Sequence, residues 1–149
     1  MDNILAITIG HIMTKDIIAA GPTNRFSQLF QFFSERNINH MPIVENGKLI
    51  GIISNKDIVR LLYKYVILQK RTDIAALDEE LKIIDLMTKD VVTATEDTTI
   101  VDVKDMFGKQ PFNCLPVVNA EGHLVGIVTP KDLMKMKIIH VDGSDYGGY

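Results

Sequence analysis

Hydrophobic and polar positions follow two periods along the chain, one typical of helices and one typical of strands. Short apolar runs at residues 41–44 and 49–53 flank an Asn-Gly pair, which predicts a β-hairpin. A helix is expected to begin near Asn55, with Ser54 as its N-cap. An earlier helix is predicted from apolar residues spaced i, i+3, i+4 and i+7, which are Phe26, Leu29, Phe30 and Phe33.

The chain contains an internal repeat, so this pattern occurs twice. Met13-Thr14-Lys15-Asp16 recurs as Met87-Thr88-Lys89-Asp90, and residues 51–57 recur as 126–132 after one inserted residue in the turn. A β-branched stretch after each Met-Thr-Lys-Asp segment predicts a first strand. Each copy therefore predicts the order β-α-β-β-α, and the fold class is α+β.

The second copy repeats the helical signals of the first. Thr129 is the expected N-cap before Pro130, and the predicted helix ends are Asn37 in the first copy and Gln110-Pro111 in the second. The second apolar face is formed by Ile100, Val103, Met106 and Phe107.

A long connector separates the copies. Residues 61–69 extend the last helix of the first copy, and residues 73–84 predict another helix with Ile74, Leu77, Leu81 and Ile84 on one side. We expect these two helices to form an exposed hairpin that acts either as a spacer or as a partner surface. The Gly-rich end at residues 142–149 is expected to fray.

Composition narrows the class of protein. The chain has 16 basic and 19 acidic side chains, a net charge of −3, which argues against a nucleic-acid surface. No apolar run approaches the roughly 18 residues of a membrane span. The single cysteine, Cys114, cannot form an intrachain disulfide and favours a reducing compartment. A cytoplasmic protein without nucleic-acid or membrane partners is expected.

Catalytic signals are sparse. The four histidines lack the i, i+4 spacing of a helical zinc site, so no metal site is predicted. Cys114 could serve as a nucleophile only with a basic partner, and its repeat counterpart is His40. Its alternative interpretation is a small, half-buried residue beside Leu115. An enzyme is therefore not expected.

A hydroxyl residue followed three positions later by Asp occurs at both strand-to-helix junctions. Helical N-terminal amides and a hydroxyl can donate hydrogen bonds to an anion such as phosphate. A carboxylate can accept two hydrogen bonds from adjacent hydroxyls, which a ribose presents. The same spacing is also a common helix-capping arrangement. The two pairs are Ser54 with Asp57 and Thr129 with Asp132.

These motifs resemble those of CBS domains, named after cystathionine β-synthase. The family signature is matched by residues 87–92, Leu115-Pro116-Val117-Val118 and 126–132, and again in the first half. The resemblance covers about residues 8–138. It implies a tandem pair (a Bateman module) of two units packed with pseudo-twofold symmetry, which binds adenosine-containing ligands and regulates a partner.

The resemblance also assigns site residues. Asp57 and Asp132 match the ribose-binding Asp, Ser54 and Thr129 its hydroxyl partner, and Ile52 and Ile127 the apolar lining of the adenine slot. Each cleft of the family takes an early strand from the opposite half. The Asp57 cleft would thus recruit Asp90 and Val92, and the Asp132 cleft Asp16 and Ile18.

The phosphate positions differ between the two copies. Family members often hold an Arg or His just before the Leu-Pro pair, and these positions here are Asn39-His40 and Asn113-Cys114. The absence of an arginine disfavours a polyphosphate, while Lys56 and Lys131 could add charge. Because Pro130 lacks the N–H that Asn55 has, we expect the Asp57 cleft to bind a phosphate-bearing ligand more tightly.

The expected organisation is a CBS domain at 8–66, a helical connector at 67–83, a second CBS domain at 84–138 and a flexible tail at 139–149. The predicted function is a stand-alone regulatory module that binds AMP, ADP, ATP or S-adenosylmethionine, needs no cofactor, forms a homodimer and signals to an enzyme or transporter. The alternative is a ligand-free dimerisation or interaction module.

Overall fold

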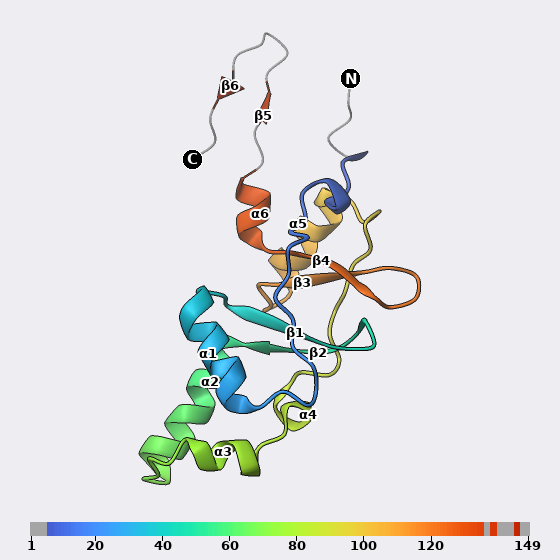
Figure 1. The fold of residues 1–149 in the computed structure, drawn as a ribbon. Coiled ribbons are helices and arrows are strands. Elements are labelled where there is room, and N and C mark those ends of the chain that lie inside the picture. Colours follow the sequence, from blue (N-terminus) through green and yellow to red (C-terminus); the bar gives the residue numbers. More distant parts are fainter. Residues whose placement is uncertain (1–5, 136–137, 140–144, 147–149) are drawn as a thin grey trace. The chain divides into compact units, whose positions relative to one another are not determined.

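The computed structural model describes residues 6–135, 138–139 and 145–146 (Figure 1). The chain forms two units. One comprises Ile18–Val91 and is called the continuous unit below. The other combines Met1–Ile17 with Val92–Tyr149 and is called the split unit. The boundaries between the units therefore fall just after the two Met-Thr-Lys-Asp segments, which we call the lead segments.

The continuous unit contains the first predicted hairpin and the helices around it. Asn46 and Gly47, at the tip of the hairpin, both have positive φ (52° and 81°), as a type I′ turn requires. Asn37 ends the first helix in the left-handed conformation, as predicted. Its elements are α1 (Phe26–Arg36), β1 (His40–Glu45), β2 (Lys48–Ser54), α2 (Asn55–Leu62), the π-helix η3 (Tyr63–Leu68), α3 (Ala75–Glu80) and α4 (Ile83–Leu86).

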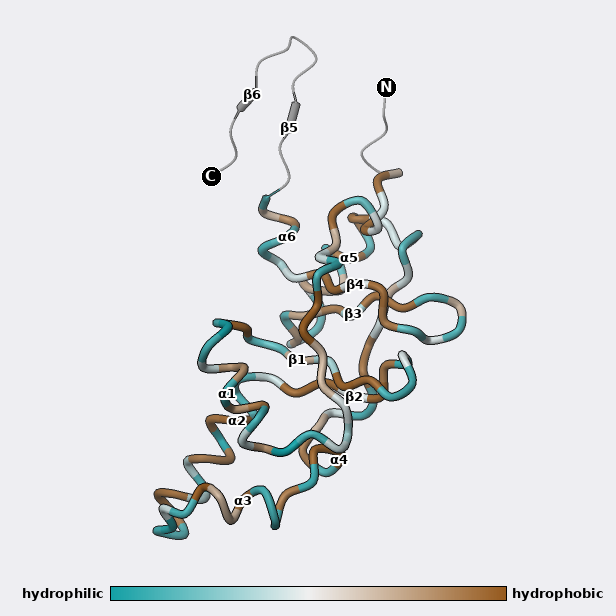
Figure 2. Tube along the Cα trace, viewed as in Figure 1, coloured by the Kyte–Doolittle hydropathy of each residue, from teal (hydrophilic) through white to brown (hydrophobic). Residues whose placement is uncertain are grey.

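The split unit contains the second hairpin. Its longer turn is organised by Asn119, whose Oδ1 accepts hydrogen bonds from the N–H groups of Glu121 (3.1 Å) and His123 (2.9 Å). The turn and its counterpart in the continuous unit are among the hydrophilic segments in Figure 2, whereas the strands are largely hydrophobic. The elements are η2 (Ile9–His11), α5 (Ile100–Lys109), β3 (Leu115–Val118), β4 (Leu124–Val128), α6 (Pro130–Met134), β5 (Ile138–Ile139) and β6 (Asp145–Tyr146).

The mixed composition of helices and two antiparallel hairpins confirms the α+β class. The pair β5 and β6 lies in the Gly-rich end of the chain. Fraying was predicted for residues 142–149 and a flexible tail for 139–149; of these residues the structure describes only 139, 145 and 146, and the others lie outside the described residues.

Each lead segment pairs with the hairpin of the other sequence copy. Thr14 exchanges two backbone hydrogen bonds with Ile127, both 2.9 Å long. Thr88 exchanges the corresponding bonds with Ile52, at 2.9 and 3.0 Å. The units that pack together are therefore not the units that repeat in the sequence.

The predicted first strand of each copy is reduced to a single parallel bridge. Ala20 pairs with Ile43, and Ala94 pairs with Val117. Neither pairing extends into a strand, and the neighbouring residues explain why. Pro22 has no N–H to donate to a ladder, and the N–H of Thr95 bonds the Thr98 hydroxyl at 3.1 Å instead.

A glycine in each hairpin makes room for the lead methionine. A Cβ atom placed on Gly51 would lie 2.4 Å from the sulfur of Met87, and one on Gly126 would lie 2.5 Å from the sulfur of Met13. Both distances are far below van der Waals contact. The repeated Gly and Met of the two sequence motifs are therefore complementary parts of one packing contact.

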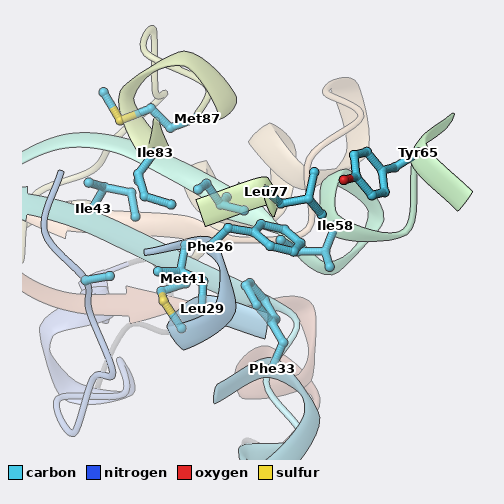
Figure 3. Packing of buried hydrophobic residues seen from close by; sticks show 12 residues of the cluster. Phe26, Leu29, Phe33, Met41, Ile43, Ile58, Tyr65, Leu77, Ile83 and Met87 are labelled. Atoms are coloured by element: carbon cyan, nitrogen blue, oxygen red, sulfur yellow. The ribbon is translucent and has the colours of Figure 1, made fainter. Parts of the chain in front are cut away.

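The connector is not the exposed hairpin that the sequence predicted. Tyr65, Leu77 and Ile83 are buried in the core of the continuous unit, together with Phe26 and Ile58 (Figure 3). The predicted helix over 73–84 is broken, because Leu81 is extended between α3 and α4. As a result Ile83 faces the core, and Ile84 is 41% exposed.

One polar contact fixes the connector to the rest of the unit, and a second joins residues within the connector. Asp78 accepts hydrogen bonds from the Ser27 N–H (2.8 Å) and the Ser27 hydroxyl (2.6 Å), so it caps the start of α1 from a position 51 residues away. Arg71 lies over the ring of Tyr65, 4.3 Å from its centre, and donates to Glu80 at 2.8 Å. The connector thus forms part of the folded unit.

The glycine–methionine contact predicts a coupled loss of stability. Gly51→Ala should lower the free energy of unfolding by about 1–3 kcal/mol, because the added methyl group overpacks the site. The double variant Gly51→Ala/Met87→Ala should lose less free energy of unfolding than the sum of the losses in the two single variants. Chemical denaturation measures all three values. The matched control is Gly108→Ala in α5, where a Cβ meets nothing within 4 Å. This change should stabilise the helix by about 0.5–1 kcal/mol. Strict additivity at Gly51 and Met87 would contradict the contact.

The cap from Asp78 predicts a pH-dependent contribution to stability. The hydrogen bonds from the Ser27 hydroxyl and N–H lower the pKa of Asp78 below its ordinary value. Its stabilisation is therefore present above pH of about 3.9 and is lost as the pH falls through the lowered pKa. Asp78→Ala should cost about 0.5–2 kcal/mol at neutral pH and progressively less in acid. The neighbouring exposed Glu79→Ala serves as control, and an equal loss in both variants would refute the cap.

Candidate functional site

The Asp57 corner lies where β2 passes directly into α2. The Asp57 Oδ2 atom accepts hydrogen bonds from the Ser54 N–H (2.8 Å) and the Ser54 hydroxyl (2.9 Å), and the Asp57 N–H donates to the Ser54 hydroxyl at 3.3 Å. This is the predicted capping arrangement. It uses only one carboxylate oxygen, since the Oδ1 atom accepts no hydrogen bond from the residues that the structure describes.

The Asp132 corner lies at the junction of β4 and α6 and has the same core. The Asp132 Oδ2 atom accepts hydrogen bonds from the Thr129 N–H (2.9 Å) and the Thr129 hydroxyl (3.2 Å). A third bond distinguishes it from the Asp57 corner: the Thr14 hydroxyl donates to the Oδ1 atom at 3.3 Å. Sequence reasoning did not single out Thr14, because the signal lies in the lead segment and not next to the Asp.

His40 belongs to the Asp57 corner. It begins β1 and pairs across the hairpin with Ser54. Burial lowers the pKa of His40, the Asp57 carboxylate raises it, and the nearby Lys56 lowers it, with a net lowering. The structure therefore places His40, for which the sequence left the cleft open, beside Ser54, Lys56 and Asp57.

Cys114 belongs to the Asp132 corner and is poorly suited to nucleophilic chemistry. Its side chain is buried directly before β3. Burial and the Asp132 charge raise the pKa of the thiol to about 12. Because the thiolate is the reactive form, a thiol with this pKa is almost wholly protonated at neutral pH. The alternative role of Cys114 as a nucleophile would therefore lack the reactive thiolate.

The Asp57 cleft was expected to bind a phosphate-bearing ligand more tightly because Asn55 has a backbone N–H that Pro130 lacks. This reason is wrong, since the N–H of Asn55 is not free. The N–H of Asn55 donates to the carbonyl oxygen of Asn39 at 2.8 Å. Neither Asn55 nor Pro130 therefore offers a backbone N–H to a phosphate. The hydrogen bond joins two residues 16 positions apart, and a local sequence pattern could not reveal it.

The remaining predicted residues divide between the two units. Asp90 follows Thr88 in the unit of Asp57, and Asp16 follows Thr14 in the unit of Asp132. The sequence grouped Val92 with Asp57 and Ile18 with Asp132. In the structure Val92 belongs to the split unit, which holds Asp132, and Ile18 belongs to the continuous unit, which holds Asp57. The continuous unit also holds Ile52, and the split unit holds Asn113, Ile127 and Lys131.

A groove of about 260 Å³ lies between α2 and α4 of the continuous unit. Asp57 contributes to it, but its floor includes Ile53 and not Ile52. Successive residues of a strand point to opposite faces, so this groove lies on the helical face of the hairpin. Its lining residues are Ile53, Asp57, Ile58, Arg60, Leu61, Lys64, Asp85 and Leu86.

Neither a metal site nor a membrane-spanning helix is found in the described part of the chain. No three His, Cys, Asp or Glu side chains lie close enough together to hold a metal ion within residues 6–135 and the two short strands after them. No helix in these same residues is long and apolar enough to cross a bilayer.

Comparison with known proteins identifies the repeat. The family model of the CBS domain matches twice, at residues 9–64 and 83–138. Two solved structures resemble the chain. CBSX2 of Arabidopsis thaliana, in complex with AMP, has 25% identity and a TM-score of 0.71 over 85% of this chain and 92% of its own. The CBS domain pair of protein MJ0100, in complex with 5′-methylthioadenosine and S-adenosyl-L-methionine, has 31% identity and a TM-score of 0.66 over 85% and 95%.

Several relatives are much longer than this chain. Inosine-5′-monophosphate dehydrogenase of Methanocaldococcus jannaschii is 29% identical over 127 residues, which are 85% of this chain and 23% of the dehydrogenase. The chain spans less than half the length of several other curated relatives. The similarity to the dehydrogenase therefore covers less than a quarter of that protein and includes most of the CBS repeat of this chain.

Proposed function

The chain belongs to the CBS domain family, and from this membership we propose that it is a regulatory module whose ligand is an adenosine-containing molecule. The observation that carries the proposal is the Oδ1 atom of Asp57, which accepts no hydrogen bond from the described residues and is oriented by a cap that occupies only Oδ2. A fixed carboxylate with a vacant oxygen is suited to accept the two adjacent hydroxyls of a ribose.

Other side chains of the same corner extend this proposal to base and phosphate. Ile52, held by its bonds to Thr88, supplies an apolar surface for adenine. His40 and Lys56 supply donors for a phosphate, and Asp57 and Lys56 both lie close enough to His40 to influence its pKa. In the split unit, Ile127 and Lys131 correspond to Ile52 and Lys56, and Asp132 is the ribose acceptor. The counterpart of His40 is Cys114, so Asn113 is the polar side chain proposed for this position. Asp16, Ile18, Asp90 and Val92 complete the proposed set.

This donor set favours a ligand with one phosphate or none. Lys56, Lys131 and His40 are its cationic or titratable donors, and no arginine is among them. AMP and S-adenosylmethionine are therefore the preferred candidates, ahead of ADP and ATP. CBSX2 and MJ0100 were crystallised with ligands of these two kinds.

We further propose that the module acts as a cytoplasmic homodimer that signals to an enzyme or transporter. Apolar side chains exposed on α1, α2 and η3 support association, since Phe32, Val59 and Tyr63 are 42%, 59% and 57% exposed. Light scattering tests the dimer. The alternative function, a ligand-free interaction module, is favoured by the capping bonds at both corners, which give the carboxylates a structural role without any ligand.

Calorimetry on carboxylate variants separates the two functions. Replacing Asp57 by Ala should weaken AMP binding by about 10- to 150-fold, because a charged acceptor is lost. Asp132→Ala should weaken binding only at its own corner. Asp102→Ala provides the matched control, since Asp102 lies in the first turn of α5 behind another N-cap, Thr99. If Asp57→Ala lowers stability by about 1 kcal/mol with AMP affinity unchanged, Asp57 is only a helix cap and does not bind the ribose. If the unaltered protein binds no adenosine-containing ligand at all, the ligand-free function is correct.

The pKa of His40 predicts how binding depends on pH. A protonated imidazole donates a charge-assisted hydrogen bond to phosphate, so AMP affinity should fall as the pH rises through the pKa of His40. Burial lowers this pKa in the free protein, so the affinity should begin to fall at a pH below about 6.5. AMP also titrates near pH 6, so His40→Ala and adenosine serve as controls. An identical pH profile in His40→Ala would exclude His40 from the site.

A further inference from the structure

The two carboxylates of the repeat differ in how much of their hydrogen-bonding capacity is used. A carboxylate has about four acceptor positions, two on each oxygen. Within the part of the chain that the structure describes, Asp57 uses two of them, both on Oδ2 and both for Ser54. Asp132 uses three, because the Thr14 hydroxyl occupies Oδ1 in addition to the two bonds from Thr129. Asp57 can thus accept two further hydroxyls, whereas Asp132 can accept one.

The backbone does not explain this difference. Thr14 and Thr88 are repeat counterparts, and each exchanges two backbone hydrogen bonds of 2.9–3.0 Å with the opposite hairpin. Only the hydroxyl of Thr14 reaches a carboxylate. The hydroxyl of Thr88 makes no side-chain bond to any residue between positions 6 and 135, so the same residue type has two different roles.

We infer that the Thr14 hydroxyl is a specificity-determining group, which competes with a ligand's vicinal diol for Asp132 and makes this carboxylate the weaker diol receptor. The inference rests on the proposed function, because it concerns the same ligand class. At Asp57 both ribose hydroxyls have an acceptor. At Asp132 one hydroxyl finds its acceptor already occupied, so removing a hydroxyl from the ligand has little effect there.

The experiment compares adenosine with 2′-deoxyadenosine by calorimetry on the full chain. The Asp57→Ala variant silences the first corner, so that binding reports on Asp132. Adding Thr14→Val removes the hydroxyl and keeps the β-branched shape. It should strengthen adenosine binding by about 2- to 12-fold, the worth of one hydrogen bond, and raise the preference for adenosine over 2′-deoxyadenosine by a similar factor.

Two further variants separate this role from a structural one. Thr14→Ser restores the hydroxyl and should return both quantities to those of the Asp57→Ala parent. Thr88→Val in an Asp132→Ala background, the repeat counterpart, should leave affinity and preference unchanged. A general loosening of the fold would alter both nucleosides equally and would not be reversed by Ser.

The outcomes distinguish this inference from the proposed function. If the parent variants bind adenosine but Thr14→Val changes neither affinity nor preference, the inference is wrong and the proposed function stands. The same conclusion follows if Thr14→Ser behaves like Thr14→Val. If the unaltered protein binds AMP or S-adenosylmethionine but neither nucleoside at millimolar concentration, this inference fails and the proposed function stands. If it binds none of these four molecules, the proposed function fails, and this inference fails with it.

Discussion

Two pairs of backbone hydrogen bonds, from Thr14 to Ile127 and from Thr88 to Ile52, determine how this chain is organised. Each joins a lead segment to a hairpin of the other sequence copy. The lead methionine then packs where a glycine leaves no side chain, Met13 on Gly126 and Met87 on Gly51. Because the glycine and the methionine come from different copies, neither copy can complete a core from its own sequence.

The candidate site depends on the same contacts. Ile52 and Ile127, the proposed adenine-lining residues, are the residues whose backbones the lead threonines hold. Ile52 lies shortly before the strand-to-helix junction that carries Asp57, and Ile127 lies shortly before the junction that carries Asp132. A change in the position of a lead segment would therefore act directly on a residue that is proposed to touch ligand. This gives the module a physical route from binding to a rearrangement of the chain.

The sequence predicted those features that local interactions determine. The type I′ turn at Asn46-Gly47 and the end of α1 at Asn37 depend on backbone preferences within a few residues, and the structure confirms them. The residues alone did not reveal the exchange of lead segments, since both copies carry the same Gly and Met. Only the family resemblance implied that each cleft takes an early segment from the opposite half. The burial of Leu77 and the bond from Asn55 to Asn39 also escaped prediction, because each depends on partners distant in sequence or on a helix break at Leu81.

Repeats preserve residue types more faithfully than they preserve hydrogen-bonding roles. Thr14 and Thr88 are identical in type and in backbone pairing, so an argument from sequence treats the two corners as equal at these positions. Their inequality arises from one side-chain bond, from Thr14 to Asp132. If the two corners bind the same nucleoside, this bond separates their affinities without changing any residue that contacts the base. The module would then respond to ligand over a wider range of concentrations than two equal sites allow, and a single hydroxyl would set the width of that range.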